Sequence, residues 1–463
     1  MANAIGDEAA AGSDPSPITP AELRIAAWTA SLGSALEYYD FALYSLASAL
    51  IFTPLFFPGQ APGIGLLASF ATYFVGFAVR PIGGIVFGGL GDRLGRKFVL
   101  LATILLMGLG STAIGLLPTF EQAGVLAPIL LVLCRIMQGL GAGAEQAGAA
   151  VLMTEYAPKG RRGFFASLPF LGIQIGTIIA ALVYFILLYG TESITDSWLW
   201  RLPFLGSVLI LAVAIWMRLH LKESPTFQKL KAHEQDREHP LRTLLRGSRR
   251  PILIGIGLRL AENGGSSIYQ ALAVSYLVGT MGLPRADGSL GLIIAAILGA
   301  ITVPIAGSLT DRFGRRPVYR GFAILQFVLA IPTWWTFSQG YATLSLALLA
   351  VSLGIGAWGM FGAQGALMPE LFGARHRYLG VSMAREISAV IAGGIAPLIG
   401  SALISMTIAR NPADTHGVGA WLPIALYLMA LTAGTIWATF LLPETRDRDL
   451  NAIEDATAPG RSS

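Results

Sequence analysis

The sequence predicts an all-α membrane protein with twelve transmembrane helices. Of its 463 residues, 54% are hydrophobic and 13% are charged, and the mean hydropathy is +0.64. A soluble globular domain carries about 25% charged residues. Uninterrupted apolar runs recur along almost the full length, and a helix needs about 20 such residues to cross a bilayer. Because the runs are continuous rather than alternating, they exclude a transmembrane β-barrel, and no separate soluble domain fits between them.

The expected helices follow these apolar runs. They cover residues 24–52, 62–90, 98–118, 124–156, 164–190, 198–221, 251–279, 289–310, 317–338, 341–369, 379–408 and 419–442. The stretch TPAE, Thr19–Glu22, has the spacing of a capping box with proline at the first helical position, which predicts where the first helix begins. Residues 1–20 lack the basic start and the apolar core of a signal peptide, and their composition predicts a disordered tail.

The basic residues predict how the chain is oriented. Those of the short loops fall on one side, at Arg93, Arg96, Lys97, Lys159, Arg161, Arg162, Arg312, Arg315, Arg316, Arg375 and Arg377. The longest connection, 222–250, is also basic, whereas the opposite loops hold little beyond Arg285 and Arg410. The positive-inside rule then places both termini in the cytoplasm of a bacterial-type inner membrane. The net charge of +5 forms no basic face, so no nucleic-acid partner is expected.

An internal repeat divides the chain into two halves. GGLGDRLGRK at 88–97 recurs as GSLTDRFGRR at 307–316, and MTEYAPKGRRGFFAS at 153–167 aligns with MPELFGARHRYLGVS at 368–382. Two six-helix halves are therefore expected. They cover 21–221 and 251–445, with the basic loop 222–250 between them and a cytoplasmic tail at 446–463. Membrane proteins built from repeats place their substrate site near the midplane between the halves, so the repeat indicates a transporter.

These motifs resemble those of the major facilitator superfamily. Its loop signature, G, three residues, D, R, one residue, G, R and a basic residue, occurs here once in each half. Five stretches are similar to the metabolite:proton symporter branch: EYYDFALY, VRPIGGIVFGGLGDRLGRK, CRIMQGLGAGAE, WRLPF and HLKESPTF. Three others look closest to shikimate-type carriers: LRLAENGGSSIY, MGLPR and GARHRYLGVSMAREISAVIAGGIAP. The sequence departs from many members of the branch at Tyr38, Ala144 and Gln146. The resemblance implies the major facilitator fold and proton-coupled symport of a small organic acid.

Two acids in the first span need an explanation, because an isolated carboxylate is costly in an apolar medium. Asp40 in the first span and Arg135 in the fourth are expected at comparable depth, where they can pair. By resemblance to proton-coupled members, such a pair forms a protonation switch; the alternative is a static structural ion pair. Glu37 shares a helix face with Asp40 and can either carry the proton or make a packing hydrogen bond. We favour Asp40 as the proton carrier.

Cations at membrane depth predict an anionic cargo. The planar guanidinium groups of Arg80 and Arg259 match a carboxylate in two-point contact, although Arg80 can instead tie helices together. The candidate substrate-binding residues are Arg80, Tyr44, Gln138, Glu145, Arg259, Glu262 and Tyr269, and candidate hydroxyl readers are Gln174, Asn263, Gln270 and Gln364. For individual glutamines and tyrosines, helix packing is the favoured alternative.

The loop motifs predict a cytoplasmic gate. An aspartate can dock on the positive N-terminal end of a neighbouring helix, and the resemblance implies this role for Asp92 and Asp311. The other expected members are Gly88, Arg93, Gly95, Arg96, Glu155, Arg162, Glu223, Arg312, Gly314, Arg315, Glu370, Arg377 and Glu444. For the arginines, membrane topology alone is an alternative explanation.

The sequence thus predicts a monomeric carrier driven by the proton gradient, without a cofactor. Its expected partners are protons, the lipid bilayer and a small carboxylate substrate. No Walker motif supports ATP drive. An enzyme is not expected, because His220, His233, His239, His376 and His416 all lie in loops or at helix ends. Two alternatives remain open: a proton antiporter or efflux carrier of the same fold, and a membrane sensor that transports nothing.

Overall fold

The computed structural model describes residues 19–60, 63–94, 96–143, 146–190, 194–195, 197–220, 247–374, 376–410 and 417–457. The side chains of residues 88–100, 146–147, 214, 217–220 and 408–410 are not among those described. The expected tail and basic loop lie mostly outside this part, because residues 1–18 and 221–246 are not described.

The N-terminal half begins with a capped helix and contains six helical spans. Thr19 caps α1 (Pro20–Leu50) with the reciprocal bonds of a capping box to Glu22, as the TPAE motif predicts. The remaining elements are α2 (Phe52–Phe56), α3 (Ile64–Ala78), α4 (Arg80–Leu94), α5 (Arg96–Ile114), α6 (Phe120–Ala123), α7 (Leu126–Ala142), α8 (Gln146–Tyr156), α9 (Arg162–Tyr189), η1 (Trp198–Arg201) and α10 (Leu202–His220).

The C-terminal half also contains six spans, three of which include π-helical segments. The elements are α13 (Arg249–Ser267), η2 (Ile268–Ala273), η3 (Tyr276–Thr280), α14 (Arg285–Phe313), α15 (Arg315–Ser338), α16 (Ala342–Leu349), η4 (Ala350–Ala357), α17 (Trp358–Leu371), α18 (Arg377–Ser388), η5 (Ala389–Gly394), α19 (Ile395–Arg410) and α20 (Val418–Leu441). All twelve predicted spans are therefore present. Span eight begins at Arg285 rather than 289, directly after Pro284.

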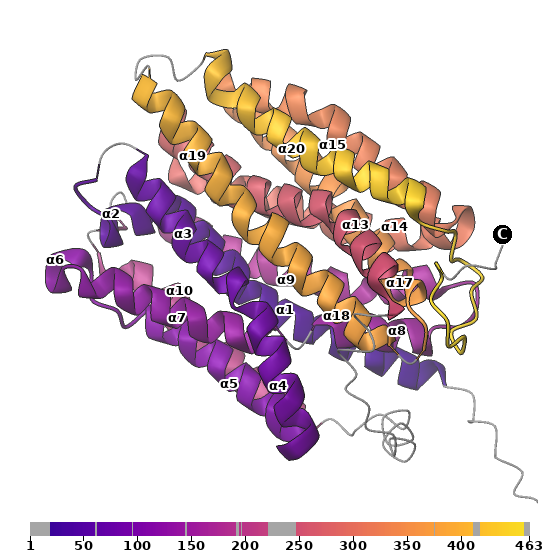
Figure 1. Ribbon diagram of the computed structural model, residues 1–463. Coiled ribbons are helices and arrows are strands. Elements are labelled where there is room, and N and C mark those ends of the chain that lie inside the picture. The colour runs from indigo at the N-terminus through magenta and orange to yellow at the C-terminus, as the bar shows by residue number, and fades with distance from the viewer. Residues whose placement is uncertain are drawn as a thin grey trace, which may run out of the picture.

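Most of the spans are apolar helices that suit a membrane. Seven stretches of the described residues are long enough and apolar enough to cross it, and Leu101–Ile114, Leu126–Ala142 and Trp198–Val213 are shorter apolar helices. Figure 1 shows the N-terminal half, from indigo to magenta, beside the C-terminal half, from red to yellow. Across the boundary α9 packs on α14 and α17, and α3 packs on α19.

Glycines let helix backbones approach closely at two places that matter for the site. A Cβ on Gly172 of α9 would lie 1.8 Å from the carbonyl oxygen of Ser31 in α1, within the N-terminal half. A Cβ on Gly163, at the start of α9, would lie 2.3 Å from the carbonyl oxygen of Gly307 in α14, across the two halves. Small residues at helix crossings permit such close packing in membranes. The first contact holds one half together, and the second holds the two halves against each other.

Candidate functional site

A small polar cavity lies between the two halves. Its volume is about 20 Å³, and its walls are Tyr38, Phe77 and Arg80 from the N-terminal half and Arg259, Asn263, Arg385, Glu386 and Ala389 from the C-terminal half. This is room for about one water molecule. Three guanidinium groups therefore converge on one closed space at the boundary where repeat-built carriers hold their cargo.

Arg80 connects the two halves through carboxylates. Its Nε donates to Glu386 Oε2 of α18 at 2.9 Å, and its Nη2 lies 3.5 Å from Glu37 Oε1 of α1. The guanidinium also lies 5.0 Å from the ring centre of Phe41 and 5.6 Å from that of Phe77. Arg80 therefore links the two halves through its ion pair with Glu386 and also lines the cavity.

Arg259 is held by its own half of the protein. Its Nη1 lies 2.8 Å from Glu262 Oε1, its Nε donates to Ser388 Oγ at 3.0 Å, and its Nη2 donates to Asn263 Oδ1 at 3.2 Å. Nη1 also donates to Gln364 Oε1. Of the residues predicted to bind substrate hydroxyls, Asn263 lines the cavity and Gln364 hydrogen-bonds Arg259. Glu262, a predicted substrate-binding residue, is fully buried and pairs with Arg259 outside the cavity wall.

Sequence reasoning missed two charged residues of the cavity wall. Arg385 and Glu386 are adjacent in α18 and both are buried. The Arg385 guanidinium lies 5.5 Å from the ring centre of Phe170 in α9, on the other side of the boundary. The available signal was an arginine and a glutamate inside the apolar run 379–408, since charges there are rare and mark functional positions.

The predicted ion pair between Asp40 and Arg135 is not formed. Asp40 accepts a 2.9 Å hydrogen bond from Ser207 Oγ of α10 and also interacts with the Ser111 hydroxyl of α5. It therefore faces the interior of the N-terminal half and not the cavity. The two acids of α1 point to different neighbours, because Glu37 contacts Arg80.

Arg135 is satisfied without a carboxylate. It donates from Nη1 to Gln138 Oε1 at 2.9 Å and from Nη2 to the carbonyl oxygen of Tyr73 at 3.1 Å, and it lies 3.8 Å from the ring centre of Tyr44. Among the ion pairs of the described residues, none includes Arg135 or Asp40. Polar groups and an aromatic face thus hold this buried cation.

Three other predicted substrate contacts among the described residues do not line the cavity. Gln138 bonds Arg135 and Ser111, and Tyr44 shares a 2.6 Å hydrogen bond with Thr72. Tyr269 is fully buried away from the cavity walls, and Glu145 lies outside the described residues. The packing alternative therefore describes Gln138, Tyr44 and Tyr269 better in this arrangement.

Asp311 joins the halves at one end of the bundle, which we call the gate end. Its carboxylate accepts from the backbone N–H groups of Gly163 at 2.7 Å and Phe164 at 2.9 Å, at the start of α9. Arg315 lies 2.7 Å from Asp311 and makes two 3.0 Å hydrogen bonds to Glu370. An acid at a helix N-terminus is favourable because it meets unpaired N–H groups and the positive end of the helix dipole.

Further contacts cross the boundary at the gate end. Arg377 Nη1 lies 2.7 Å from Glu155 Oε1, and Arg162 Nη1 donates to the carbonyl oxygen of Arg448 at 2.8 Å.

Two other predicted gate residues make contacts within the C-terminal half. Arg312 lies beside the ring of Phe313. Glu444 caps α15 by accepting from the N–H of Arg315 at 2.8 Å, directly after Gly314, whose φ is 98°.

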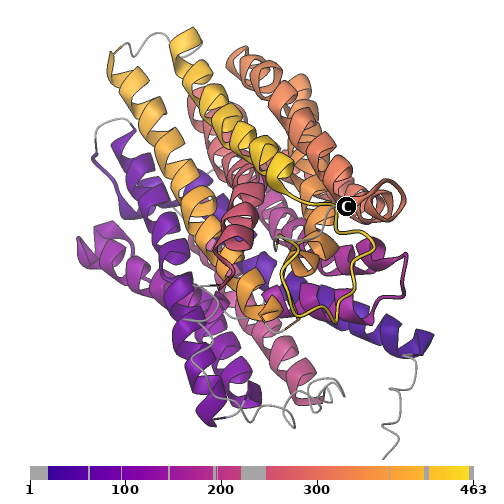
Figure 2. The same ribbon diagram turned by 45° about the vertical axis from the view of Figure 1, so that its right-hand side comes forward.

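The C-terminal segment, residues 444–456, folds back over the gate end (Figures 1 and 2). Ala374 N–H donates to the carbonyl oxygen of Ala452 at 2.9 Å, and Ala456 N–H donates to that of Leu371 at 3.0 Å. Gly373 lies so close that a Cβ there would be 1.9 Å from the Ile453 carbonyl oxygen. The segment therefore closes over the loop between α17 and α18.

The first-repeat gate residues lie largely outside the described part. The backbone of Gly88, Asp92, Arg93 and Arg96 belongs to described helices, but their side chains are not described, and Gly95 and Glu223 are not described at all.

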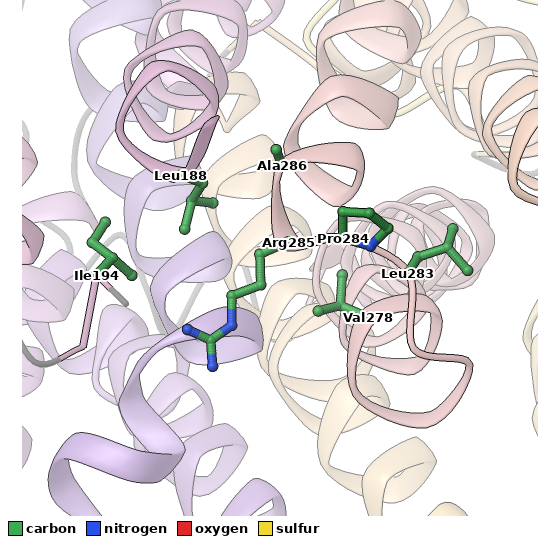
Figure 3. A pocket seen from close by; sticks show the side chains of 7 residues that line it. All are labelled: Leu188, Ile194, Val278, Leu283, Pro284, Arg285 and Ala286. Atoms are coloured by element: carbon green, nitrogen blue, oxygen red, sulfur yellow. The ribbon is translucent and has the colours of Figure 1, made fainter. Parts of the chain in front are cut away.

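The halves also meet at the opposite end, which we call the outer end. Ser405 Oγ donates to the Gly63 carbonyl oxygen at 3.0 Å, and Leu50 packs beside Gly288. A second cavity of about 360 Å³ lies at this end, lined by Leu188, Ile194, Val278, Leu283, Pro284, Arg285 and Ala286. Figure 3 shows the Arg285 side chain extending across it, with apolar side chains around it. The central cavity is thus closed off by contacts at both ends.

Curated relatives match the chain over most of its length. It is 36% identical to the shikimate transporter of Escherichia coli, covering 90% of this chain and 94% of that protein. It is 35% identical to an inner membrane metabolite transport protein of the same organism, covering 93% and 97%, and 32% identical to its proline/betaine transporter, covering 95% and 87%. A solved D-xylose-proton symporter matches with a TM-score of 0.67 at 19% identity, covering 91% of this chain and 98% of that one.

The family model of the Major Facilitator Superfamily matches residues 30–397. The twelve spans, the repeated loop motif and the relatives agree with that match. This chain therefore belongs to the Major Facilitator Superfamily and is a membrane-spanning metabolite transporter rather than an enzyme.

Proposed function

We propose that this protein takes up a small organic acid together with protons by alternating access. The observation that carries the proposal is the convergence of Arg80, Arg259 and Arg385 on one cavity between the halves. Glu386 is the one carboxylate that joins them in the described cavity wall, so the wall itself is mostly cationic, while Glu37 and Glu262 pair with Arg80 and Arg259 from outside the wall. A guanidinium fork binds a carboxylate through two parallel hydrogen bonds, which gives both affinity and orientation.

Asp40 is our candidate for the proton site. Its side chain is buried and is hydrogen-bonded by the hydroxyls of Ser207 and Ser111, while Arg135 acts on it through its charge without a direct ion pair. A buried carboxylate whose nearest cation is not in direct contact can gain or lose a proton when its surroundings change. The relatives support both parts of the proposal, since one is named for shikimate and a structural neighbour for protons.

The contacts between the halves support alternating access. The Asp311 and Glu155 contacts close the gate end, and the Ser405 and Leu50 contacts close the outer end. Breaking one set while keeping the other would open the cavity to one side at a time. We further infer from the cation distribution that the gate end and both termini lie in the cytoplasm of an inner membrane, and that the carrier acts as a monomer.

Transport by purified protein in liposomes tests the proposal. Shikimate, 2-oxoglutarate, citrate, benzoate and glycine betaine are supplied in labelled form, with the outside more acidic than the inside. We expect one of the acids to accumulate above its equilibrium level, a protonophore to abolish this, and cargo addition without an imposed gradient to make a lightly buffered outside more alkaline.

Two results contradict the proposal. Acidification of the outside on cargo addition indicates the antiport alternative. Movement of glycine betaine with none of the acids contradicts an organic-acid cargo.

A further inference from the structure

The ion pair between Arg80 and Glu386 is a buried polar contact between the halves. Arg80 is 4% exposed and Glu386 is 6% exposed, and their 2.9 Å contact joins α4 to α18 across the cavity. Glu37 lies on the other side of the same guanidinium, at 3.5 Å. The closest carboxylate to Arg80 among the described residues is therefore supplied by the opposite half.

The charges buried around the cavity balance only when Glu386 is included. Three guanidiniums and three carboxylates gather there: Arg80, Arg259, Arg385, Glu37, Glu262 and Glu386. Removing one member of a buried group of charges leaves an uncompensated charge, which is strongly destabilising. Without Glu386, closing the halves would bury one excess positive charge.

The closed arrangement has no room for a metabolite. Its central cavity of about 20 Å³ accommodates roughly one water molecule, whereas ligand sites in proteins are usually about 300–1,000 Å³. A carrier passing through this arrangement moves without cargo. Its own side chains must then neutralise Arg80, because no cargo carboxylate fits beside it.

We propose that Glu386 is a tethered substitute for the cargo carboxylate, which neutralises Arg80 when the halves close unloaded and is displaced by the cargo when they close loaded. This inference rests on the proposed function, because it requires an anionic cargo. It deepens that function by explaining how the carrier returns empty. Net uptake requires the unloaded return, whereas exchange of one cargo molecule for another does not.

Cysteine labelling tests the unloaded closure without any cargo. Ser167→Cys at the gate end and Leu50→Cys at the outer end are reporters, because both side chains are buried against the opposite half. Each is made with Cys134→Ser, so that no other cysteine is present. The purified protein is then treated with a maleimide.

We expect Glu386→Gln to increase the labelling rate of at least one reporter threefold or more. Glu386→Asp, which retains the charge, should label more slowly than Glu386→Gln. The double variant Arg80→Gln with Glu386→Gln removes one charge of each sign and should return the rate toward that of the parent. The double variant also separates loss of charge balance from misfolding, since it carries the same Gln at position 386.

A second arm adds shikimate, an acid that a relative is named for carrying. We expect shikimate at about 10 mM, a saturating concentration for most carriers, to slow the labelling of Glu386→Gln more than that of the parent. In liposomes, Glu386→Gln should lose net shikimate uptake but retain shikimate exchange.

The possible failures are distinguishable. If Glu386→Gln labels no faster than the parent at both reporters, unloaded closure does not depend on Glu386 and the inference is overturned. If it labels faster but shikimate does not slow it, displacement by this cargo is refuted. If the parent itself carries none of the acids under a proton gradient, the proposed function fails, whatever the labelling shows.

Discussion

Arg135 and Gln138 form a 2.9 Å hydrogen bond inside the N-terminal half. The Gln138 amide donates in turn to Ser111 Oγ at 2.6 Å, and Ser111 interacts with Asp40. The cation and the acid that were expected to touch are thus joined through two intervening side chains. A change at Asp40 can reach Arg135 through this chain of polar contacts, without a direct ion pair.

Gln138→Leu should break this connection at nearly constant volume. It leaves Nη1 of the buried Arg135 and the Ser111 hydroxyl without their Gln138 partner, and an unsatisfied buried polar group costs about 1–3 kcal/mol. We expect a lower Tm for the purified protein and slower proton-driven transport. Gln60→Leu is the control, because that side chain is exposed, and it should change neither value. An unchanged Tm for Gln138→Leu would show that Arg135 is held by its other contacts alone.

Asp40→Asn should abolish uphill accumulation while sparing exchange. Asparagine can still accept the hydrogen bond from Ser207, but it cannot bind and release a proton. Uptake under an imposed pH gradient and exchange at equal pH are measured in the same liposomes. Glu121→Gln removes an exposed acid near the outer end and should leave both intact. Normal accumulation by Asp40→Asn would remove Asp40 from the coupling role.

Asp311→Asn should favour opening of the gate end. The amide loses the negative charge that faces the N-terminus of α9 and weakens the contact with Arg315. We expect faster maleimide labelling of the Ser167→Cys reporter. Asp287→Asn makes the same change in the first turn of α14, at the outer end, and should leave the rate of this reporter unchanged. Equal rates for Asp311→Asn and the parent would contradict a gate role for Asp311.

Two glycine-to-alanine changes in α9 should have different effects. In a helix interior this change usually stabilises by about 1 kcal/mol, but here the added Cβ meets backbone oxygen. Gly172→Ala pushes α9 away from α1 within the N-terminal half, so we expect a lower Tm. Gly163→Ala forces α9 from α14 between the halves, so we expect faster labelling of Ser167→Cys with a smaller change in Tm. The same Tm loss with unchanged labelling in both variants would show that Gly163 is a packing residue only.

The positions of the helices could be predicted from the sequence because apolar length is set by the bilayer itself. All twelve spans and the capping box at Thr19 are where the pattern indicates. The pairing of Asp40 with Arg135 was wrong for a physical reason: rise per residue fixes the depth of a side chain, but the packing of neighbouring helices decides its direction. Asp40 faces α10 and α5, and Arg135 faces α3.

Two of the four charged residues in the cavity wall were predicted from the sequence. Arg80 and Arg259 were found because single charges inside apolar runs are conspicuous. Arg385 and Glu386 satisfy the same rule, but the sequence analysis did not single them out. In a helix, successive residues point about 100° apart, so these two side chains meet different partners.

The C-terminal segment, residues 444–456, lies where the two halves separate. Arg448 accepts from Arg162 in one half while Ala452 and Ala456 pair with the loop of the other. A fluorescent protein or an affinity tag fused after residue 457 would be attached beside this junction, and a stop codon before residue 444 would delete it. Such engineered chains should rest in a different position of the transport cycle from the native one, so transport rates measured on C-terminal fusions need comparison with a protein tagged elsewhere.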